Sequence, residues 1–227
     1  LNRDHGSMPL DRILAAAGGY ARDGYPITQR VSADFAREVD ILNEAGRAVF
    51  APDGKQLPLG ARHAQPALAA TLERIGREGR AGFYEGAVGE ELLSVLKGLG
   101  GRHEESDFAD AVGDYVTPIS TEFRGNRVWQ CPPNGQGVIA LLLLNIMSGV
   151  DTYGDTPLSA MRIHHEIEAG RLAYRDRGAV LADPAFLDVP VEQMLDPAYA
   201  DKLRAMIRDS SSLDPMPRSE LPRHRST

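Results

Sequence analysis

The chain has 227 residues, of which 42% are hydrophobic and 25% are charged, and its formal net charge is -7 at pH 7. This length fits one large domain or two small ones, and the composition is ordinary for a globular protein. The acidic balance argues against a nucleic-acid-binding surface, which would carry a basic patch, and no membrane-spanning run is seen. Because Cys131 is the only cysteine, no disulfide can form within the chain.

Apolar residues at helical spacing predict that the first half of the chain is mainly helical. The expected helices cover residues 11–22, a segment from Ser32 as N-cap to about Glu44, a segment from Pro66 to Gly76 or Gly79, the turns from Val88 to Leu96 before Gly100-Gly101, and a short turn near 108–112. The turn-rich stretch 50–60 and the glycine-bounded stretch 82–86 are predicted as loops.

The pattern changes to strands in the middle of the chain. Residues 115–117, 119–123 and 127–130 are rich in β-branched and aromatic side chains, and Arg124-Gly125-Asn126 predicts a hairpin turn between the last two. Pro132-Pro133 then ends the strand, because each proline fixes φ and removes a backbone donor.

A helix that is hydrophobic on all sides follows this turn. Residues 138–147 are nearly all aliphatic, which predicts a helix inside a core. After a loop at 151–155 we expect a long helix over 158–182, which Asp183-Pro184 ends, and a last helix over 198–207. Helices outnumber strands and the βαβ alternation of a parallel sheet is missing, so the predicted fold class is α+β.

The long helix contains four candidate metal ligands, His164, His165, Glu166 and Glu168. Adjacent side chains on a helix project about 100° apart, so the two histidines do not share an ion as the pair in a His-Glu-x-x-His motif does. One surface histidine and one packed histidine is the simpler interpretation, and no metal ligand is assigned.

A run of charged residues continues along the same helix: Arg171, Arg175, Asp176 and Arg177. Glu168 lies three residues before Arg171 and can pair with it, whereas the position four after Glu168 is Leu172. We interpret this run as a face that is solvated or salt-bridged between domains. Asp183 is expected to cap the next turn rather than to act as a base.

The remaining candidate features have structural explanations. Gly135-Gln136-Gly137 precedes a helix and could bind an anion, but it matches neither the dinucleotide fingerprint nor the P-loop, so a tight strand-to-helix turn explains its glycines. Cys131 is expected to be a small buried residue rather than a nucleophile. Ser210-Ser211-Ser212 is a linker run, and the aromatic pair within 82–86 is expected to serve packing. By themselves, these residues assemble no catalytic, cofactor-binding or metal site.

Short motifs in a fixed order nevertheless resemble the large subunit of the gamma-glutamyltranspeptidase family over about residues 6–207. The matching residues are Gly82-Phe83-Tyr84-Glu85-Gly86, Gly100-Gly101, Asp107-Phe108-Ala109, Pro118-Ile119, Phe123-Arg124-Gly125, Pro132-Pro133, Gly137-Val138, Leu144-Asn145-Ile146, and the helix from Glu168 to Asp183 with Pro184 and Phe186. Family members carry a similar Glu-Ala-x-Arg-Leu-Ala-x-x-Asp-Arg run that ends in Gly-Asp-Pro.

This resemblance implies an N-terminal nucleophile hydrolase with an αββα sandwich, in which residues 1–227 form part of the helix-rich large subunit. One precursor cleaves itself into a large and a small subunit, and the threonine that begins the small subunit attacks a gamma-glutamyl amide such as glutathione, with its own α-amino group as the base. Backbone N–H groups stabilise the oxyanion, and the acyl group passes to water or an amino acid. The implied partners are the small subunit and a small-molecule amide, with no cofactor.

The same resemblance implies a role for the end of the chain. Residues 208–227 are expected to form a flexible tail that leads to the processing site. Thr227 ends the chain whereas a nucleophile made by cleavage begins one, so Thr227 is expected to lie just before the scissile bond. No catalytic residue is therefore assigned to this chain, and the family's arginine that binds the substrate carboxylate is expected upstream of Leu1.

Two departures from the family pattern bear on the substrate. Many transpeptidases have Pro-Ser-Ser-Gly-Gly where this chain has Pro133-Asn134-Gly135-Gln136-Gly137, and Leu-Thr where it has Arg102-His103-Glu104 after the glycine pair. Because of these departures, two alternatives to a gamma-glutamyl-specific enzyme remain. One is a divergent acylase or amidohydrolase acting on another amide, such as a cephalosporin side chain or a small oxo-acid amide, and the other is a non-catalytic scaffold subunit.

The compartment is not determined by the sequence, because no signal peptide is visible. It is periplasmic or extracellular if the protein resembles exported family members, and cytoplasmic otherwise.

Overall fold

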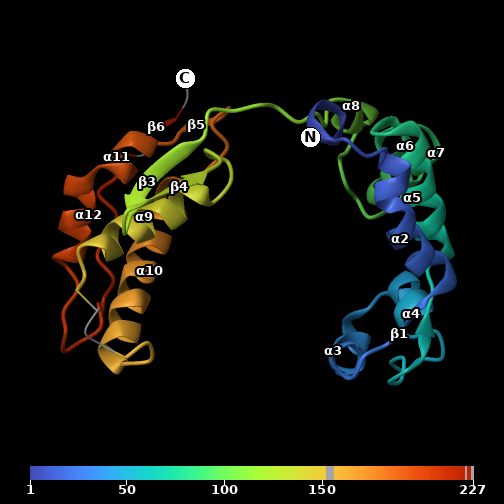
Figure 1. Ribbon diagram of the computed structural model, residues 1–227, viewed down its shortest axis with the longest axis horizontal. Helices are drawn as coiled ribbons and strands as arrows, with labels where there is room; N and C mark the ends of the chain where they lie inside the picture. The colour runs from blue at the N-terminus through green and yellow to red at the C-terminus, as the bar shows by residue number, and fades with distance from the viewer. Residues whose placement is uncertain (152–155, 223, 226–227) are drawn as a thin grey trace. The chain divides into compact units, whose positions relative to one another are not determined.

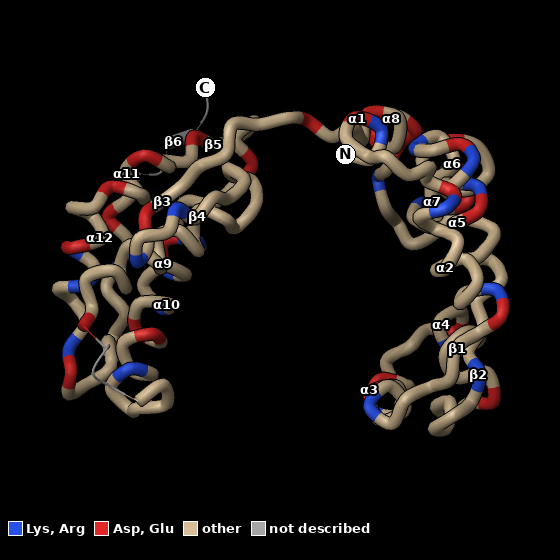
Figure 2. The backbone as a smooth tube through the Cα atoms, in the orientation of Figure 1, with Lys and Arg blue, Asp and Glu red and all other residues tan. Residues whose placement is uncertain are grey.

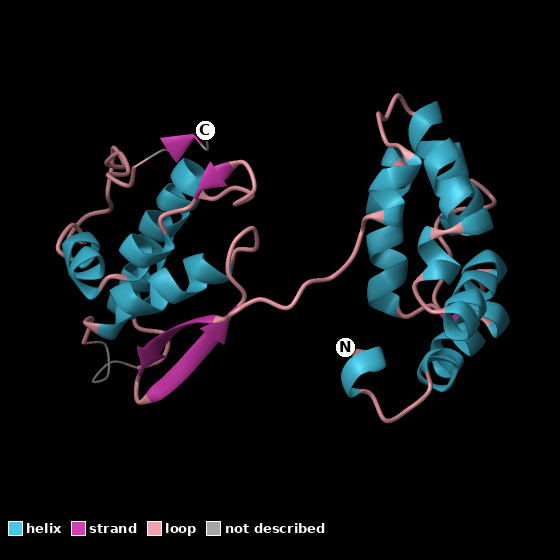
Figure 3. Cartoon of the chain, turned by 90° about the horizontal axis from the view of Figure 1, so that it is seen from above, coloured by secondary structure: helices cyan, strands magenta, loops and turns pink. Residues whose placement is uncertain are grey.

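The computed structural model describes residues 1–151, 156–222 and 224–225, and the chain divides into two compact units, Leu1–Gly113 and Asp114–Thr227 (Figure 1). Helices dominate both units and the strands are short (Figure 3), which agrees with the predicted α+β class. Acidic and basic residues are interspersed along the backbone of each unit (Figure 2). In the described part of the chain, no helix combines the length and the apolar character that crossing a membrane requires.

The first unit is built from short helices and one pair of two-residue strands. Its elements are α1 (Asn2–His5), α2 (Leu10–Asp23), β1 (Tyr25–Pro26), α3 (Gln29–Glu38), the 3-10 turn η1 (Val39–Ile41), α4 (Glu44–Phe50), β2 (Arg62–His63), α5 (Pro66–Glu78), α6 (Ala81–Tyr84), α7 (Gly86–Gly98) and α8 (Glu105–Ala109). Helix α2 packs on α5, and α6 contacts both α5 and α7. Most of the predicted helices of this half are therefore confirmed.

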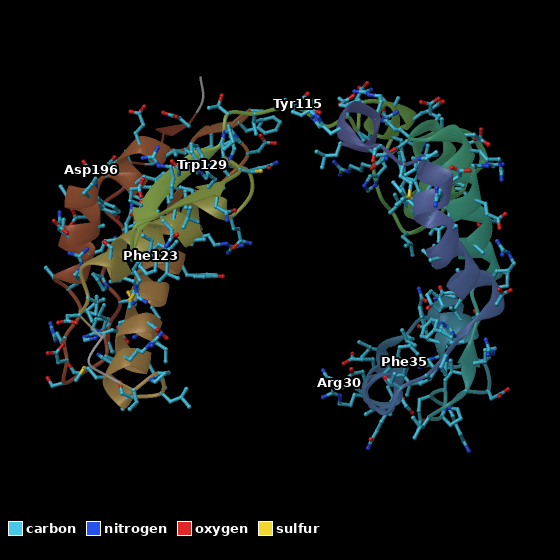
Figure 4. The ribbon with its side chains drawn as sticks, viewed as in Figure 1. Arg30, Phe35, Tyr115, Phe123, Trp129 and Asp196 are labelled. Carbon is cyan, nitrogen blue, oxygen red and sulfur yellow. The ribbon has the colours of Figure 1, made fainter. Side chains whose placement is uncertain are left out.

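His63 is the buried centre of an aromatic cluster in this unit. Its ring lies 5.8 Å from that of Tyr25, 6.2 Å from that of Phe35 and 5.6 Å from that of Phe50, measured between centroids. The cluster joins the β1–β2 pair to α3 and α4, and Figure 4 labels Phe35 within it. Contact with the buried His63 ring brings Phe35 of α3 and Phe50 of α4 together.

Two predictions for this unit are wrong. Ser32 is not an N-cap: Thr28 accepts a hydrogen bond from the Val31 N–H and begins α3, whereas the Ser32 hydroxyl donates to the Leu57 carbonyl oxygen. The predicted single helix also ends early, and Asn43 caps the separate helix α4.

The stretch predicted as a loop at 82–86 also differs, because residues 81–84 form α6. Gly82 permits this helix, since a Cβ there would lie 2.7 Å from the Arg74 carbonyl oxygen of α5. Phe83 and Tyr84 pack edge to face at 5.0 Å, as the packing interpretation of this aromatic pair expected.

The second unit contains the buried helix and the long helix. Its elements are β3 (Ile119–Phe123), β4 (Asn126–Gln130), α9 (Gly137–Ser148), α10 (Ala160–Val180), β5 (Leu187–Asp188), α11 (Val191–Leu195), α12 (Pro197–Arg204) and β6 (His224–Arg225). Residues 115–117, predicted as a strand, do not form one, because the antiparallel register pairs Ile119 with Gln130 at the end of the hairpin and no described segment pairs beyond it. Residues 152–155 of the predicted loop lie outside the described residues.

The β3–β4 hairpin turns as its sequence predicts. Arg124 and Gly125 have φ values of 53° and 76°, and positive φ at both positions suits the twist of a two-residue hairpin turn. Phe123 is partly buried against the core, whereas Trp129 is 55% exposed (Figure 4). The hairpin therefore has one face on the core and one face open.

Helix α9 is the centre of this unit, as its apolar sequence predicts. It contacts β3 and the helices α10, α11 and α12. The fully buried side chains include Leu141, Leu142 and Ile146. Each such burial contributes about 1.5–3 kcal/mol relative to an exposed side chain.

Side chains distant in sequence make hydrogen bonds at the C-terminal end of α9. Arg204 donates from Nε to the Ile146 carbonyl oxygen at 2.8 Å and from Nη2 to the Asn145 carbonyl oxygen at 3.0 Å. Asn145 hydrogen-bonds the Thr121 hydroxyl and donates to the Leu195 carbonyl oxygen. These contacts tie β3, α11 and α12 to the core helix.

The last predicted helices are confirmed with shifted ends. Ser159 caps α10 by accepting from the Arg162 N–H, and Asp196, labelled in Figure 4, caps α12 by accepting from the Ala198 N–H. Asp183 accepts from the Ala185 N–H at 2.9 Å, so it caps a turn as expected. Helix α11 was not predicted, because five residues are too few for a clear periodic pattern.

Candidate functional site

Four polar residues of α10 form one stripe along the helix: His164, Glu168, Arg171 and Arg175. Their spacing of four, three and four residues places them on a single face, because a helix turns about 100° per residue. Residues 208–222, which we call the C-terminal segment, run along this stripe in the same direction as α10. The stripe and the segment thus bring polar side chains of α10 against the backbone of residues far along the chain.

Glu168 and Arg171 hold both backbone groups of Leu213. Glu168 accepts from the Leu213 N–H through Oε2 at 3.0 Å, and Arg171 donates through Nη2 to the Leu213 carbonyl oxygen at 2.8 Å. The two side chains also pair with each other at 2.7 Å, as their spacing of three predicts. The Leu213 side chain is buried in the core of the second unit, so this residue is held by backbone and side chain alike.

The charge on Glu168 is stabilised although its side chain is only 3% exposed. Burial alone would raise the pKa of this carboxyl group. The Leu213 N–H, the Arg171 guanidinium and the His164 ring outweigh it and hold the pKa of Glu168 below its ordinary value. Glu168 is therefore a carboxylate at neutral pH and acts as an acceptor, not as a proton donor.

The two adjacent histidines bind the start of the C-terminal segment. His164 donates from Nε2 to the Arg208 carbonyl oxygen at 2.7 Å, and His165 donates from Nε2 to the Asp209 carboxylate at 3.0 Å. Among the described residues no group of three or more His, Cys, Asp or Glu could hold a metal ion. Both histidines are partly buried, so the expected split into one surface and one packed histidine is not seen.

Arg175, Asp176 and Tyr199 form a second buried cluster. Asp176 is fully buried, accepting from Arg175 Nε at 2.9 Å and from the Tyr199 hydroxyl at 2.6 Å. Burial and the hydrogen bond to Asp176 raise the pKa of Tyr199, so its hydroxyl stays a donor. The charged run was interpreted as solvated or as salt-bridged between domains. Arg175 and Asp176 do form a salt bridge, but they form it with each other inside the second unit, where Asp176 is buried against Tyr199 of α12.

The glycine turn ahead of α9 has a packing explanation. A Cβ on Gly137 would lie 2.7 Å from Gln130 Cβ and 2.8 Å from the Cys131 carbonyl oxygen, whereas Gly135 has open space around it. Gly137 is thus required by the tight strand-to-helix turn. Cys131 itself is exposed, which corrects the expectation of a buried residue, because it continues the alternation of β4, in which Trp129 is exposed and Gln130 is partly buried.

The end of the chain runs beside β5. Strand β6 pairs antiparallel with β5, with Leu187 opposite Arg225 and Asp188 opposite His224. Thr227, expected before the scissile bond, lies outside the described residues. Leu213 and Leu221 of the expected tail are buried against the core.

The residues that bind the polar side chains of α10 were not predicted from the sequence. Tyr199 lies 23 residues from Asp176, and Leu213 lies 45 residues from Glu168. A buried leucine and a tyrosine near a helix start give no local signal of such contacts. The one available signal was the repeated spacing of ionisable residues on α10, which is unusual for a helix that also carries core residues.

Comparisons with known proteins identify the relatives of this chain. A family model for gamma-glutamyltranspeptidase matches residues 1–226. The chain is 34% identical over 203 residues to a glutathione hydrolase-like YwrD proenzyme from Bacillus subtilis (strain 168), covering 88% of this chain and 39% of that protein. It is 34% identical over 205 residues to an acylase ACY 1 proenzyme from Pseudomonas sp. (strain SE83), covering 89% of this chain and 37% of that protein.

A solved structure agrees with these relatives. The gamma-glutamyltranspeptidase of Helicobacter pylori matches with a TM-score of 0.85 and 26% identity, covering 94% of this chain and 62% of that chain. The chain spans about two fifths of the length of the two curated relatives.

Proposed function

The chain belongs to the gamma-glutamyltranspeptidase family, and on this premise we propose that it is part of the large subunit of a self-processing gamma-glutamyltransferase or hydrolase. Its substrates are gamma-glutamyl amides such as glutathione, and the acyl-enzyme forms on a threonine of the partner small subunit. The observation that carries the proposal is the family match over 1–226, in a chain that spans only 39% of a glutathione hydrolase-like proenzyme. The missing remainder is the source of the small subunit.

The surface of the second unit supports a partner from the same precursor. Trp129 is 55% exposed on the hairpin, and Ile167 and Tyr174 on α10 are 54% and 61% exposed. The described strands β3 and β4 pair only with each other. A small subunit that adds strands to this hairpin and covers these side chains would complete the αββα sandwich.

The chemistry then belongs to the partner. The threonine hydroxyl attacks the amide carbon, its α-amino group takes the proton, and backbone N–H groups stabilise the oxyanion. An α-amine titrates near roughly 7.7–8.0, so it accepts a proton near neutral pH. Consistent with this division, no residue of this chain is proposed as catalytic.

A gamma-glutamyl anilide tests the substrate. The full-length precursor is purified after processing, and the small subunit's N-terminal residue is identified by sequencing. Release of the aniline is the expected result. No release from a protein whose small subunit begins with threonine would exclude gamma-glutamyl amides as substrates.

An acylase or amidohydrolase is the second candidate. The Pseudomonas relative named as an acylase is as similar to this chain as the glutathione hydrolase-like one, at 34% identity. A panel of a gamma-glutamyl amide, a cephalosporin side-chain amide and a small oxo-acid amide separates the candidates by kcat/KM. A non-catalytic scaffold is the remaining alternative, and a gene without a downstream segment beginning with threonine would favour it.

A further inference from the structure

We propose that Glu168 and Arg171 of α10 are positioning residues for self-cleavage, because they fix the register of the C-terminal segment that leads to the scissile bond. This inference rests on the proposed function. It assigns to the large subunit a role in maturation, although this chain supplies no catalytic group.

Leu213 is the fixed point of the segment. Both its N–H and its carbonyl oxygen are bound by α10 side chains, at 3.0 Å and 2.8 Å. Its own side chain is 6% exposed. Sliding the segment by one residue would break both backbone hydrogen bonds and withdraw the leucine from the core at the same time.

Further contacts hold the segment on each side of this point. His164 and His165 bind residues 208 and 209 upstream. Downstream, Lys202 pairs with Glu220, Leu221 is buried, and β6 pairs with β5. The segment is therefore anchored at its start, at Leu213 and near Glu220 and Leu221, and residues 224–225 pair with β5.

Register matters because of the geometry of the cleavage. A threonine hydroxyl attacks the preceding carbonyl carbon, an ester replaces the amide and frees the amine, and one water hydrolyses the ester to a carboxylate. The groups that accept the hydroxyl proton and stabilise the oxyanion sit elsewhere in the folded precursor. A slip of one residue moves the scissile bond by about 3.3 Å, as far as the whole separation of reacting atoms in a near-attack arrangement, about 3–3.5 Å.

A structural role alone explains this pair poorly. The Glu168 carboxylate is buried whereas Arg171 is 38% exposed, and the cost of desolvating a buried carboxylate offsets much of what such an ion pair contributes to stability. Ion pairs and hydrogen bonds are directional, however, and those made to the N–H and the carbonyl oxygen of Leu213 define one register of the segment. The directional contacts in this case are made to the backbone of the segment itself.

The test compares two identical substitutions on one helix in the full-length precursor. Glu168→Gln exchanges one acceptor oxygen for an NH2 group and so loses either the Arg171 or the Leu213 contact. Glu166→Gln is the matched control, since Glu166 is 47% exposed and pairs with Arg162 of the same helix. We expect cleavage, followed by intact mass over time, to slow by at least about tenfold in Glu168→Gln and to stay within about twofold of wild type in Glu166→Gln.

Hydrogen exchange separates positioning from loss of folding. In Glu168→Gln the amides of residues 210–222 should exchange faster while those of α9 stay protected. If α9 also loses protection, Arg171→Lys decides, because lysine keeps the charge beside Glu168 but replaces the two guanidinium nitrogens that reach Glu168 and the Leu213 carbonyl oxygen separately by a single ammonium nitrogen. Once cleaved, the variants should match the activity of wild type per processed molecule.

The outcomes are distinct. Cleavage at the wild-type rate in both Glu168→Gln and Arg171→Lys, with faster exchange in residues 210–222, overturns the positioning role. A wild-type precursor that never cleaves overturns the proposed function and this role with it. A cleaved wild type that leaves gamma-glutamyl anilide intact overturns only the substrate.

Discussion

The hydroxyl group of Tyr199 donates a 2.6 Å hydrogen bond to the fully buried carboxylate of Asp176, 23 residues earlier on another helix. This bond joins α12 to α10 beneath the C-terminal segment. It also explains how a charged residue can occupy the core beside Leu172 and Ala173, because each carboxylate oxygen has a donor.

Removing this hydroxyl should destabilise the protein. Tyr199→Phe leaves Asp176 Oδ2 without its donor, and we expect a loss of about 1–3 kcal/mol in the free energy of unfolding. Urea unfolding of the full-length protein measures it. Tyr174→Phe is the control, since Tyr174 is 61% exposed, and its effect should stay below about 0.5 kcal/mol. Equal losses in both variants would contradict this account.

Glu168 should make the protein acid-sensitive. Its pKa is lowered in the folded state, so the unfolded state binds the proton first as the pH falls. The stability it contributes is complete above its ordinary pKa of 4.5 and is lost as the pH falls through the lower folded value. Unfolding free energies measured from pH 7 to pH 3 should therefore fall less steeply in Glu168→Gln than in wild type. Parallel curves would show that this carboxylate is not the titrating group.

Substitution by alanine should destabilise the protein at Gly137 but not at Gly135. Gly137→Ala places a Cβ against Gln130 and the Cys131 carbonyl oxygen, and we expect a loss of about 1–3 kcal/mol from overpacking. Gly135→Ala meets no atom within 4 Å and should be close to neutral. Thermal unfolding of the two variants compares them directly, and a neutral Gly137→Ala would remove the packing explanation for this turn.

The isolated chain should self-associate. Trp129, Ile167 and Tyr174 expose apolar surface that the proposed small subunit covers. Light scattering of the separated chain should report species larger than a monomer, and addition of the small subunit should abolish them. A stable, monodisperse monomer would argue that these side chains need no partner.

Elements governed by local patterns were predictable. Strand β4 ends ahead of Pro132 and Pro133, the apolar run after them forms the buried helix α9, and Asp183 caps the turn that follows α10. Errors arose where the deciding contact was distant. Ser32 was expected to cap a helix but binds Leu57, and residues 115–117 found no partner strand.

The sequence by itself determined the α+β class, the buried helix and the family, because periodicity and ordered motifs are local properties of the chain. Only the tertiary structure decided the fate of the charges on α10. The spacing along α10 predicted the pair of Glu168 with Arg171, but it did not predict that Glu168 and Asp176 are buried. Their further hydrogen bonds come from Leu213 and Tyr199, which lie 45 and 23 residues away. Burial of a charge depends on donors that folding brings together, and no pattern along α10 specifies which distant residues those are.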